Sequence, residues 1–439
     1  MDIHDPARLL VEWFEAAVAA ADPRRATADA VHALTNLAGT VSVIAVGKGA
    51  HAMASGAVDA LSELGVHVDG GLVVAHSDTD DATHGLDVAI GDHPVPGSGS
   101  FEAARRLGTV LDAVPRSDDA IVLVSGGATS LLAGPVEGLR GQDVTALFKA
   151  LLASGADIEV MNAIRKRVLR WGAGRLAVAL QARRVHCLVA SDVPGNDAAF
   201  IASGPCVPDE LTAADVLVRA DRAGVLPALP PAVVSLIKQH VAGLRDETPK
   251  PSHPRFRTTT SRVILDRHVA VDGATASARA AGVDVTVYDA PLTGDAALAG
   301  AAIATRALDT AADSSGGAPR LIAWSGETTV ELDAGSGTGG RCQEIALSAA
   351  CMLDRAGERA RPVTILAAGT DGRDGPTDAA GAVVGYKTWE RIAAAGIDPE
   401  AALAHHDSHQ ALEAVGALLR TGPTGTNVND LVLALVSPP

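Results

Sequence analysis

Short apolar runs that end at glycine-rich turns, each followed by an amphipathic helix, recur along this chain and restrict its fold class. Residues 41–46 (VSVIAV) lead into Gly47-Lys48-Gly49, and residues 121–124 (IVLV) lead into Ser125-Gly126-Gly127. Unbroken Val, Ile and Leu runs that alternate with helices are typical of parallel strands covered on both faces. The pattern predicts an α/β fold with mainly parallel sheets flanked by helices. Ligands of such sheets bind beyond the carboxyl ends of the strands, where these turns lie.

The length of the chain predicts two domains. Its 439 residues exceed an ordinary single domain, and a hydrophobic content of 47% can fill two cores. The segment from Asp246 to Thr260 is rich in Pro, Thr and charged residues, which is typical of a linker. We therefore expect an N-terminal Rossmann-like domain over residues 1–245, a linker over 246–260 and a C-terminal α/β domain over 261–439. A single long helix is predicted from about residue 157 to residue 182.

Charge and composition exclude several classes of partner. The formal net charge is −16 and aromatic residues make up 3% of the chain, so neither nucleic acid nor an anionic membrane surface is an expected partner. The N-terminal segment reads as an amphipathic helix and not as a signal peptide, and no apolar run reaches the length of about 18 residues expected of a membrane span. The four cysteines match no zinc spacing and are expected to be reduced thiols. A cytoplasmic protein is predicted.

Two turns of the first half are candidate anion sites. Glycines let the backbone approach a ligand closely, and free amides at a helix N-terminus favour an anion. Lys48 adds a positive charge, although the GxxxxGK[ST] spacing of a Walker A loop is absent. The alternative is that both turns are purely structural and bind no anion, and that Lys48 is simply an exposed lysine. The candidate cofactor-binding residues here are Gly47, Gly49, Ser125, Gly126, Gly127, Thr129 and Ser130.

Two further segments of the first half carry polar side chains. Asn162, Arg165 and Lys166 lie within one turn of a predicted helix and share a face, so they are candidate substrate-binding residues. A solvated basic face is the alternative. Asp192 directly follows the apolar run 186–191, where its carboxylate could hold a metal or accept a hydroxyl proton; simple Asp and Pro-Gly turn chemistry is the alternative.

The second half contains three glycine-rich loops. Residues 335–340 lead into a predicted helix that begins at Arg341, which offers backbone amides, the helix dipole and a guanidinium to one anion. Asp371 belongs to an acidic glycine loop that suits magnesium, whereas an EF-hand is excluded by its ligand spacing. Residues 421–430 form a third small, polar loop. Four residues of these loops are further candidates for binding a cofactor: Gly339, Gly340, Thr370 and Asn427. Glu344, in the helix that begins at Arg341, is a further candidate for binding a substrate.

These segments together supply what phosphoryl transfer needs: donors around phosphates, mobile cations, and carboxylates for a metal or a proton. They also carry a family resemblance. The motifs VGKGA, GDHPVPG, NAIRK, ASDVPGND, SGETTV, GGR-x-QE, GTDG-x-DGPTDAAGA and TGPTGTNVNDL occur in this order. With them the chain resembles, over nearly its whole length, the bacterial glycerate 2-kinases of the MOFRL family, some of which are labelled hydroxypyruvate reductase.

The resemblance implies two α/β domains with an active-site cleft between them, ATP and Mg²⁺ as cofactors, and phosphorylation of D-glycerate to 2-phosphoglycerate. Lys48, in the GKGA motif, and Arg341, in the GGR motif, would be the essential cations. Asp192 and Asp371 would be the catalytic or metal-binding carboxylates, and which of them is base and which is metal ligand stays open. The partners would be a small hydroxy acid and ATP, and the protein would be a monomer or a homodimer.

The chain departs from the family pattern at four positions: Ala128, Arg167, Cys342 and Arg373. A kinase for a larger sugar acid, such as a four-carbon aldonate, is therefore the first alternative. A nicotinamide-dependent reductase is disfavoured, because no GxGxxG follows a strand with an acidic residue about 20 positions on. A binding protein without catalysis is the third alternative. The presence of Lys48, Asp192, Arg341 and Asp371 argues against it.

Overall fold

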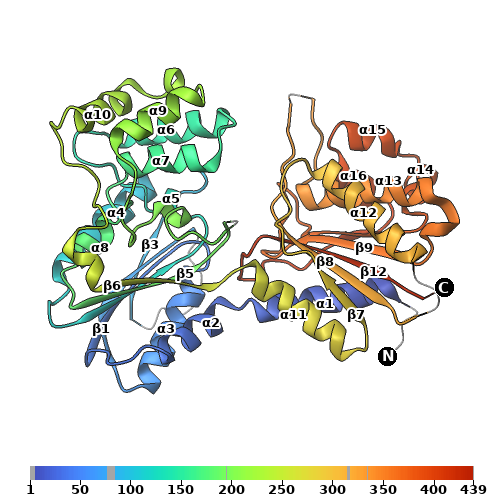
Figure 1. Cartoon of the computed structure of the whole chain (residues 1–439), viewed down its shortest axis with the longest axis horizontal. Helices are drawn as coiled ribbons and strands as arrows, with labels where there is room; N and C mark the ends of the chain where they lie inside the picture. The colour runs from blue at the N-terminus through green and yellow to red at the C-terminus, as the bar shows by residue number, and fades with distance from the viewer. Residues whose placement is uncertain (1–4, 77–84, 194, 314–316, 334, 439) are drawn as a thin grey trace. The chain divides into compact units, whose positions relative to one another are not determined.

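The computed structural model describes the chain apart from residues 1–4, 77–84, 194, 314–316, 334 and 439. It divides into two compact units (Figure 1). The N-unit comprises residues 23–265, and the C-unit comprises residues 1–22 together with residues 266–439. Two α/β domains are thus confirmed, and each is described below by itself.

The N-unit is built on a six-stranded sheet in the order β3-β2-β1-β4-β5-β6. Every pairing in it is parallel, as predicted. Because the strands run the same way, their carboxyl ends meet at one edge of the sheet, and the predicted glycine turns lie there. The strands are β1 (Thr40–Val46), β2 (His67–Ala75), β3 (Asp87–Ile90), β4 (Asp119–Val124), β5 (Arg184–Ala190) and β6 (Thr259–Leu265).

Helices of the N-unit form two groups. One group flanks the sheet, and α6, α7, α9 and α10 form a separate helical cluster with its own core (Figure 1). The helices are α2 (Pro23–His32), α3 (Ala50–Glu63), α4 (Ser98–Ala113), α5 (Ala128–Leu131), α6 (Gly141–Ala153), α7 (Ile158–Val168), α8 (Arg175–Ala179), α9 (Ala213–Arg222), α10 (Pro231–Val241) and the 3₁₀ turns η1 (Ile201–Ser203), η2 (Leu226–Ala228) and η3 (Pro254–Arg257).

The single helix predicted over residues 157–182 is wrong. The chain leaves α7 after Val168 and begins α8 at Arg175. Between them Ala173 and Gly174 have positive φ angles of 55° and 76°, which a continuous right-handed helix cannot contain.

The C-unit is built on a six-stranded sheet in the order β11-β10-β9-β12-β8-β7. Here the prediction of a mainly parallel sheet is wrong: among the described strands only β7 and β8 pair in parallel. β12 is buried along its whole length between two antiparallel neighbours, so its unbroken apolar run looks like that of a parallel strand. The strands are β7 (Asp284–Val287), β8 (Arg320–Gly326), β9 (Val363–Gly369), β10 (Gly381–Gly385), β11 (Leu418–Leu419) and β12 (Asp430–Val436).

Helices cover both faces of the C-unit sheet (Figure 1). The first helix of the chain, α1, packs beside α11 on one face, and α12 and α13 pack on the other. α13 begins at Arg341, as predicted. The helices are α1 (Pro6–Ala20), α11 (Arg267–Ala280), α12 (Ala296–Ala312), α13 (Arg341–Ala356), α14 (Thr388–Ala394), α15 (Pro399–Ala404), α16 (Ser408–Glu413) and the 3₁₀ turn η4 (Gly357–Ala360).

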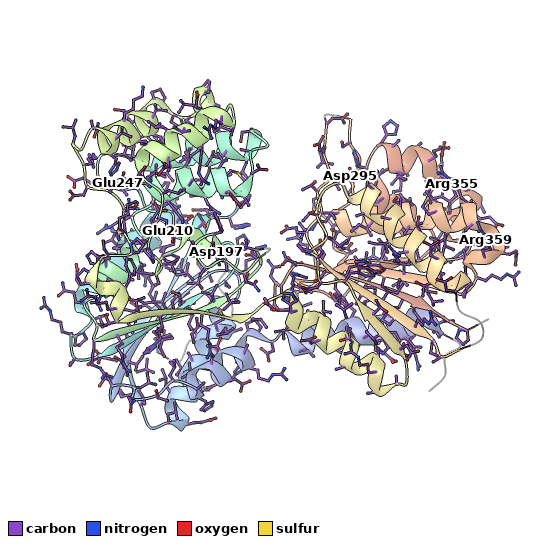
Figure 2. All side chains as sticks on the ribbon, viewed as in Figure 1. Asp197, Glu210, Glu247, Asp295, Arg355 and Arg359 are labelled. Carbon is purple, nitrogen blue, oxygen red and sulfur yellow. The ribbon has the colours of Figure 1, made fainter. Side chains whose placement is uncertain are left out.

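The unit boundaries differ from the predicted ones. Residues 246–260, predicted as a linker, belong to the N-unit, where Thr248 donates to Asp209 Oδ2 at 2.9 Å and Asp209 N donates to Pro249 O at 3.0 Å. Glu247 of this segment, labelled in Figure 2, forms an ion pair with buried Arg167. These contacts join a polar, proline-containing segment to the rest of the N-unit, which composition alone does not reveal.

No helix in the described part of the chain is long and apolar enough to cross a membrane. The four cysteines, Cys187, Cys206, Cys342 and Cys351, are buried and free.

Candidate active site

The two predicted glycine turns of the N-unit form one structure at the carboxyl ends of β1 and β4. Lys48 N donates to Gly126 O at 2.9 Å, and Gly49 N donates to Ser125 Oγ at 2.9 Å. Gly47 has a φ of +131°, and a Cβ added there would lie 2.2 Å from Ser125 Oγ. Only glycine tolerates this approach, so the turn is built for close backbone packing.

The Lys48 side chain lies beside the second turn. A Cβ added to Gly127 would meet Lys48 Cγ at 3.4 Å and His93 Cδ2 at 3.0 Å. Lys48 is exposed, and its ammonium has no hydrogen bond or ion pair with any residue that the structure describes. Ser130 Oγ donates to Gly127 O at 3.0 Å and so stabilises the turn itself.

His93 is a site residue that the sequence reasoning missed. Its ring lies half-buried against this turn, and His76 stands 6.0 Å away with its ring perpendicular. Burial, Lys48 and His76, in that order, lower the pKa of His93 to about 4. The imidazole is therefore neutral at physiological pH. His93 lies in the GDHPVPG motif, and this motif is the sequence signal from which it could have been predicted.

Thr129 and Asn162, both predicted, are brought together by Ser203. The Ser203 hydroxyl lies 3.4 Å from Thr129 Oγ1 and donates to Asn162 Oδ1 at 3.4 Å. Asn162 Nδ2 donates to Phe200 O at 3.2 Å. The two predicted residues therefore anchor the 200–204 corner, a loop that follows Asp192 along the chain.

The alternative of a solvated basic face on α7 is wrong, because Arg165 and Lys166 are buried. Arg165 lies over the Phe148 ring at 4.6 Å, and burial lowers its pKa to about 10. Lys166 Nζ lies 3.5 Å from Asp209 Oδ1. Burial lowers the pKa of Lys166, although Asp209 acts in the opposite direction.

Asp192 lies half-buried two residues beyond the end of β5. Because β5 is parallel to β1 and β4, Asp192 belongs to the same edge of the sheet as the glycine turns.

In the C-unit the Arg341 side chain is held by two carboxylates. Its Nε and Nη2 donate to Asp430 at 2.5 and 3.0 Å, and its Nη1 donates to Glu327 Oε1 at 2.7 Å. Asp430 begins β12, opposite the last residues of β8 and β9 in the register of the sheet. Burial alone would lower the pKa of Arg341, but Asp430 and Glu327 raise it. Asp430 was not predicted, because it lies 89 residues from its partner.

The α13 N-terminus was predicted to offer its amides to a ligand. In the structure the protein's own Asp374 accepts from Cys342 N at 3.1 Å and from Gln343 N at 2.8 Å. A Cβ on Gly340 would lie 2.3 Å from Asp374 Cγ, and one on Gly339 would lie 2.2 Å from a neighbouring Ser408 oxygen. Both predicted glycines thus allow close packing inside the C-unit, and two helix amides are already satisfied.

Asp371 follows β9 and lies close to Asp430. A Cβ on Gly369 would be 3.3 Å from Asp371 Oδ1 and 3.5 Å from Asp430 Oδ1. Asp371 Oδ1 accepts from Arg373 N at 3.0 Å, and the residue is half-buried. No cluster of three or more His, Cys, Asp or Glu side chains among the described residues could hold a metal. Mg²⁺ commonly uses one or two carboxylates and takes its other ligands from phosphates and water, and Asp371 fits this mode.

Thr370 and Asn427, both predicted as nucleotide ligands, lie in two loops that are hydrogen-bonded together. Thr370 is buried; its hydroxyl donates to Asn429 O at 2.6 Å and accepts from Val428 N at 2.9 Å. Asn427 lies half-buried in the second loop. Thr370 therefore positions the loop that carries Asn427.

Glu344, predicted to bind substrate, is buried on α13. Its Oε1 lies 2.9 Å from His406 Nδ1. Burial raises the pKa of this carboxyl, and His406 opposes the shift.

Comparison with known proteins agrees with the two-unit architecture. A family model described as a domain of unknown function (DUF4147) matches residues 9–238, and the MOFRL family model matches residues 320–430. The chain is 35% identical to D-glycerate 2-kinase of Thermotoga maritima over 98% of each chain. It is also 39% identical to a protein of Agrobacterium vitis that is named as a hydroxypyruvate reductase. This match covers 91% of the present chain and 100% of the Agrobacterium vitis protein. The crystal structure of glycerate kinase from Thermotoga maritima superposes with a TM-score of 0.84 at 34% identity, covering 99% of this chain and 100% of that one.

Proposed function

Since this chain belongs to the family of glycerate kinases that carry a MOFRL domain, we propose that it transfers the γ-phosphoryl group of ATP to the 2-hydroxyl of D-glycerate. The product would be 2-phosphoglycerate. The observation that carries this proposal is the extent of the similarity, which runs through both units of the chain and covers 98% of the D-glycerate 2-kinase.

Lys48 is the proposed cation for the transferred phosphoryl group. Its ammonium is exposed, stands at a turn of glycines and small hydroxylic residues, and has no partner among the described residues. In phosphoryl transfer the protein acts mainly by positioning and by neutralising charge on the phosphoryl oxygens. Those predicted turn groups that are not already hydrogen-bonded within the turn, as the Gly49 amide and the Ser130 hydroxyl are, would bind the same phosphates.

Arg341 is the proposed anchor of a phosphate or of the substrate carboxylate. A guanidinium has five N–H donors, and Asp430 and Glu327 take three of them. The side chain is 35% exposed, so the remaining donors are available to an anion. Its two carboxylate partners fix the direction in which these donors point.

The carboxylates Asp371 and Asp192 are the proposed ligands of Mg²⁺. Asp371 is half-buried beside Arg341's partner Asp430, and Asp192 stands at the ligand-binding edge of the N-unit sheet. A Mg²⁺ ion held by these carboxylates would neutralise negative charge on the phosphates of the nucleotide.

The family departures favour D-glycerate over a larger acid. Arg167 and Cys342 are both completely buried; Arg167 is paired with Asp209 and Glu247, and the amide of Cys342 is bonded to Asp374. Ala128 is 3% exposed. These three side chains therefore pack in the interiors of their units. Among the four positions that depart from the family pattern, only Arg373 is exposed.

Four free, buried cysteines support a reducing compartment such as the cytoplasm. A monomer or a homodimer remains the proposed state.

An assay of ADP release with ATP and Mg²⁺ tests the proposal over D-glycerate, L-glycerate and four- to six-carbon sugar acids. We expect the highest kcat/KM with D-glycerate and loss of turnover when EDTA removes the metal. Turnover on a longer acid alone would support kinase activity but would show that this longer acid, and not D-glycerate, is the substrate. Oxidation of NADH with hydroxypyruvate, without ADP release from any acid, would overturn the proposal in favour of a reductase.

A further inference from the structure

His93 has the placement of a group that meets a ligand. It lies against the Gly126-Gly127 turn, where its Nε2 would be 3.2 Å from a Cβ on Gly127, beside the Lys48 side chain. Most buried polar groups of proteins have hydrogen-bond partners. Within the described ranges of the chain neither ring nitrogen of His93 has one. The imidazole therefore keeps both a donor and an acceptor for a molecule bound at the turn.

The surroundings of His93 keep it unprotonated. Lys48 from the β1–α3 turn and His76 from the end of β2 both disfavour a second positive charge. The adjacent Asp92 is engaged elsewhere, since its Oδ2 accepts from Ser100 N at 3.1 Å at the start of α4. With burial these neighbours place the pKa of His93 near 4, so its acceptor nitrogen is free throughout the neutral range.

We propose that His93 is a catalytic residue that accepts the proton of the acid's hydroxyl as this hydroxyl attacks the γ-phosphorus. The inference rests on the proposed function and deepens it. The hydroxyl O–H bond breaks and a new O–P bond forms. The bond between the γ-phosphorus and its bridging oxygen breaks, and its electron pair leaves with ADP. The proton resides on the imidazole as an imidazolium and passes to water after the products leave.

A neutral imidazole can act as the base here without adding negative charge beside the transferred phosphoryl group. The transferred phosphoryl group carries negative charge on its three outer oxygens, and a carboxylate at the attacking hydroxyl would repel it. A neutral imidazole adds no negative charge, and the imidazolium that forms in the reaction is attracted to the phosphate product. Asp192 and Asp371 then keep the single proposed role of metal ligands.

The test compares His93→Gln and His93→Ala with the wild type, with His67→Gln as the control. His67 is an exposed histidine at the opposite end of the N-unit sheet, where β2 begins. We expect kcat on D-glycerate to fall about 100-fold in H93Q with KM changed by no more than a few fold, because general base catalysis typically contributes at least this factor. In H93A, added imidazole should restore turnover in proportion to its neutral form, and H67Q should match the wild type.

The outcomes separate this inference from the proposed function. If the wild type releases no ADP with D-glycerate, the proposed function itself fails. If the wild type is active and H93Q keeps kcat within fivefold, His93 is not the base. Loss of activity without rescue of H93A by imidazole, at an unchanged melting temperature, would also overturn the role as proton acceptor. H93Q keeps the test valid if H93A does not fold.

Discussion

The two cations on which the proposed chemistry depends are held in opposite ways. Lys48 extends from a glycine turn without a partner among the described residues, whereas Arg341 is bound by Asp430 and Glu327. A lysine ammonium is a compact charge on a flexible stem, while the arginine fork binds anions in a fixed geometry. Lys48 can thus follow a phosphoryl group as it moves, and Arg341 can define where an anion binds.

Replacement of Lys48 by Ala should remove activity without harming the fold. We expect kcat to fall about 100- to 1,000-fold, the range typical when one preorganised donor to a developing charge is lost. The melting temperature should stay unchanged, because the side chain is exposed and makes no hydrogen bond within the described structure. ADP release and thermal unfolding measure the two effects. Lys149→Ala, an exposed lysine on α6, is the matched control, and turnover of K48A near that of K149A would refute the role of Lys48.

The sequence predicted those parts of the candidate site that are contiguous in the chain. The glycine turns, their position after strands and the start of α13 at Arg341 are all confirmed. Asp430, Asp374 and His93 were missed. Asp430 and Asp374 meet α13 across 89 and 32 residues of chain, and such pairings depend on sheet order, which local patterns do not contain. His93 lay in a motif that was seen, but its proximity to Lys48 is a tertiary contact.

At the scale of elements, the segment around residue 247 shows how composition misleads. Its Pro, Thr and charges predicted a linker, yet these charges belong to a buried network. Arg167, completely buried on α7, donates to Asp209 at 2.9 Å and pairs with Glu247, and Lys250 Nζ donates to Asp209 O at 3.1 Å. A buried charge must be paired. The ion pair between Glu247 and Arg167 therefore holds this segment in place beside α7.

Glu247→Gln should reveal the network through pH. Burial would raise the pKa of Glu247, but Ala213 N and Arg167 lower it to about 2, below its ordinary value of 4.5. A carboxyl with a lowered folded pKa stabilises the fold above its ordinary value and loses that contribution as the pH falls toward 2. With allowance for its side-chain exposure of 32%, we expect E247Q to lose about 1–2 kcal/mol at pH 7.

Urea unfolding at pH 7, and at steps below pH 4.5 while the protein still folds, measures this difference, which should shrink as the pH falls. Glu210→Gln is the control, since Glu210 is an exposed acid of the same unit with no hydrogen bond or ion pair to a described residue; Figure 2 labels both glutamates. A difference from the wild type that is the same at every pH would show that the Glu247 charge does not stabilise the fold.

The direction of the strands in the C-unit sheet was also predicted wrongly. A strand covered on both faces has the same apolar run whether its neighbours are parallel or antiparallel, so β12 could not be oriented from its sequence. Its direction has a consequence for the site. Because β12 runs against β8 and β9, its first residue, Asp430, reaches the edge where those two strands end. A parallel β12 would place Asp430 at the far edge, away from Arg341.

At the scale of the whole molecule, the chain passes between the units twice. It leaves the C-unit after Asp22, forms the whole N-unit, and re-enters the C-unit at Asp266. The sequence predicted an amphipathic first helix, and this is confirmed, since one face of α1 is buried through Leu9, Leu10, Trp13, Phe14 and Ala17. It could not reveal that this face packs in the C-unit, because an amphipathic pattern shows that a face is covered but not by what.

The placement of α1 predicts which unit a mutation in the first helix weakens. Trp13 is 2% exposed, and α1 packs against α11, β9 and β12, all of the C-unit. Trp13→Ala should cost about 3–5 kcal/mol through lost burial and a cavity. Although the mutation lies near the N-terminus, amide exchange should accelerate in β9 and β12 and stay unchanged in β1 and β4. Hydrogen exchange with peptide-level mass spectrometry distinguishes the units, with Leu298→Ala as the control because that C-unit leucine is 73% exposed. Faster exchange confined to β1 and β4 would show that the first helix stabilises the N-unit instead.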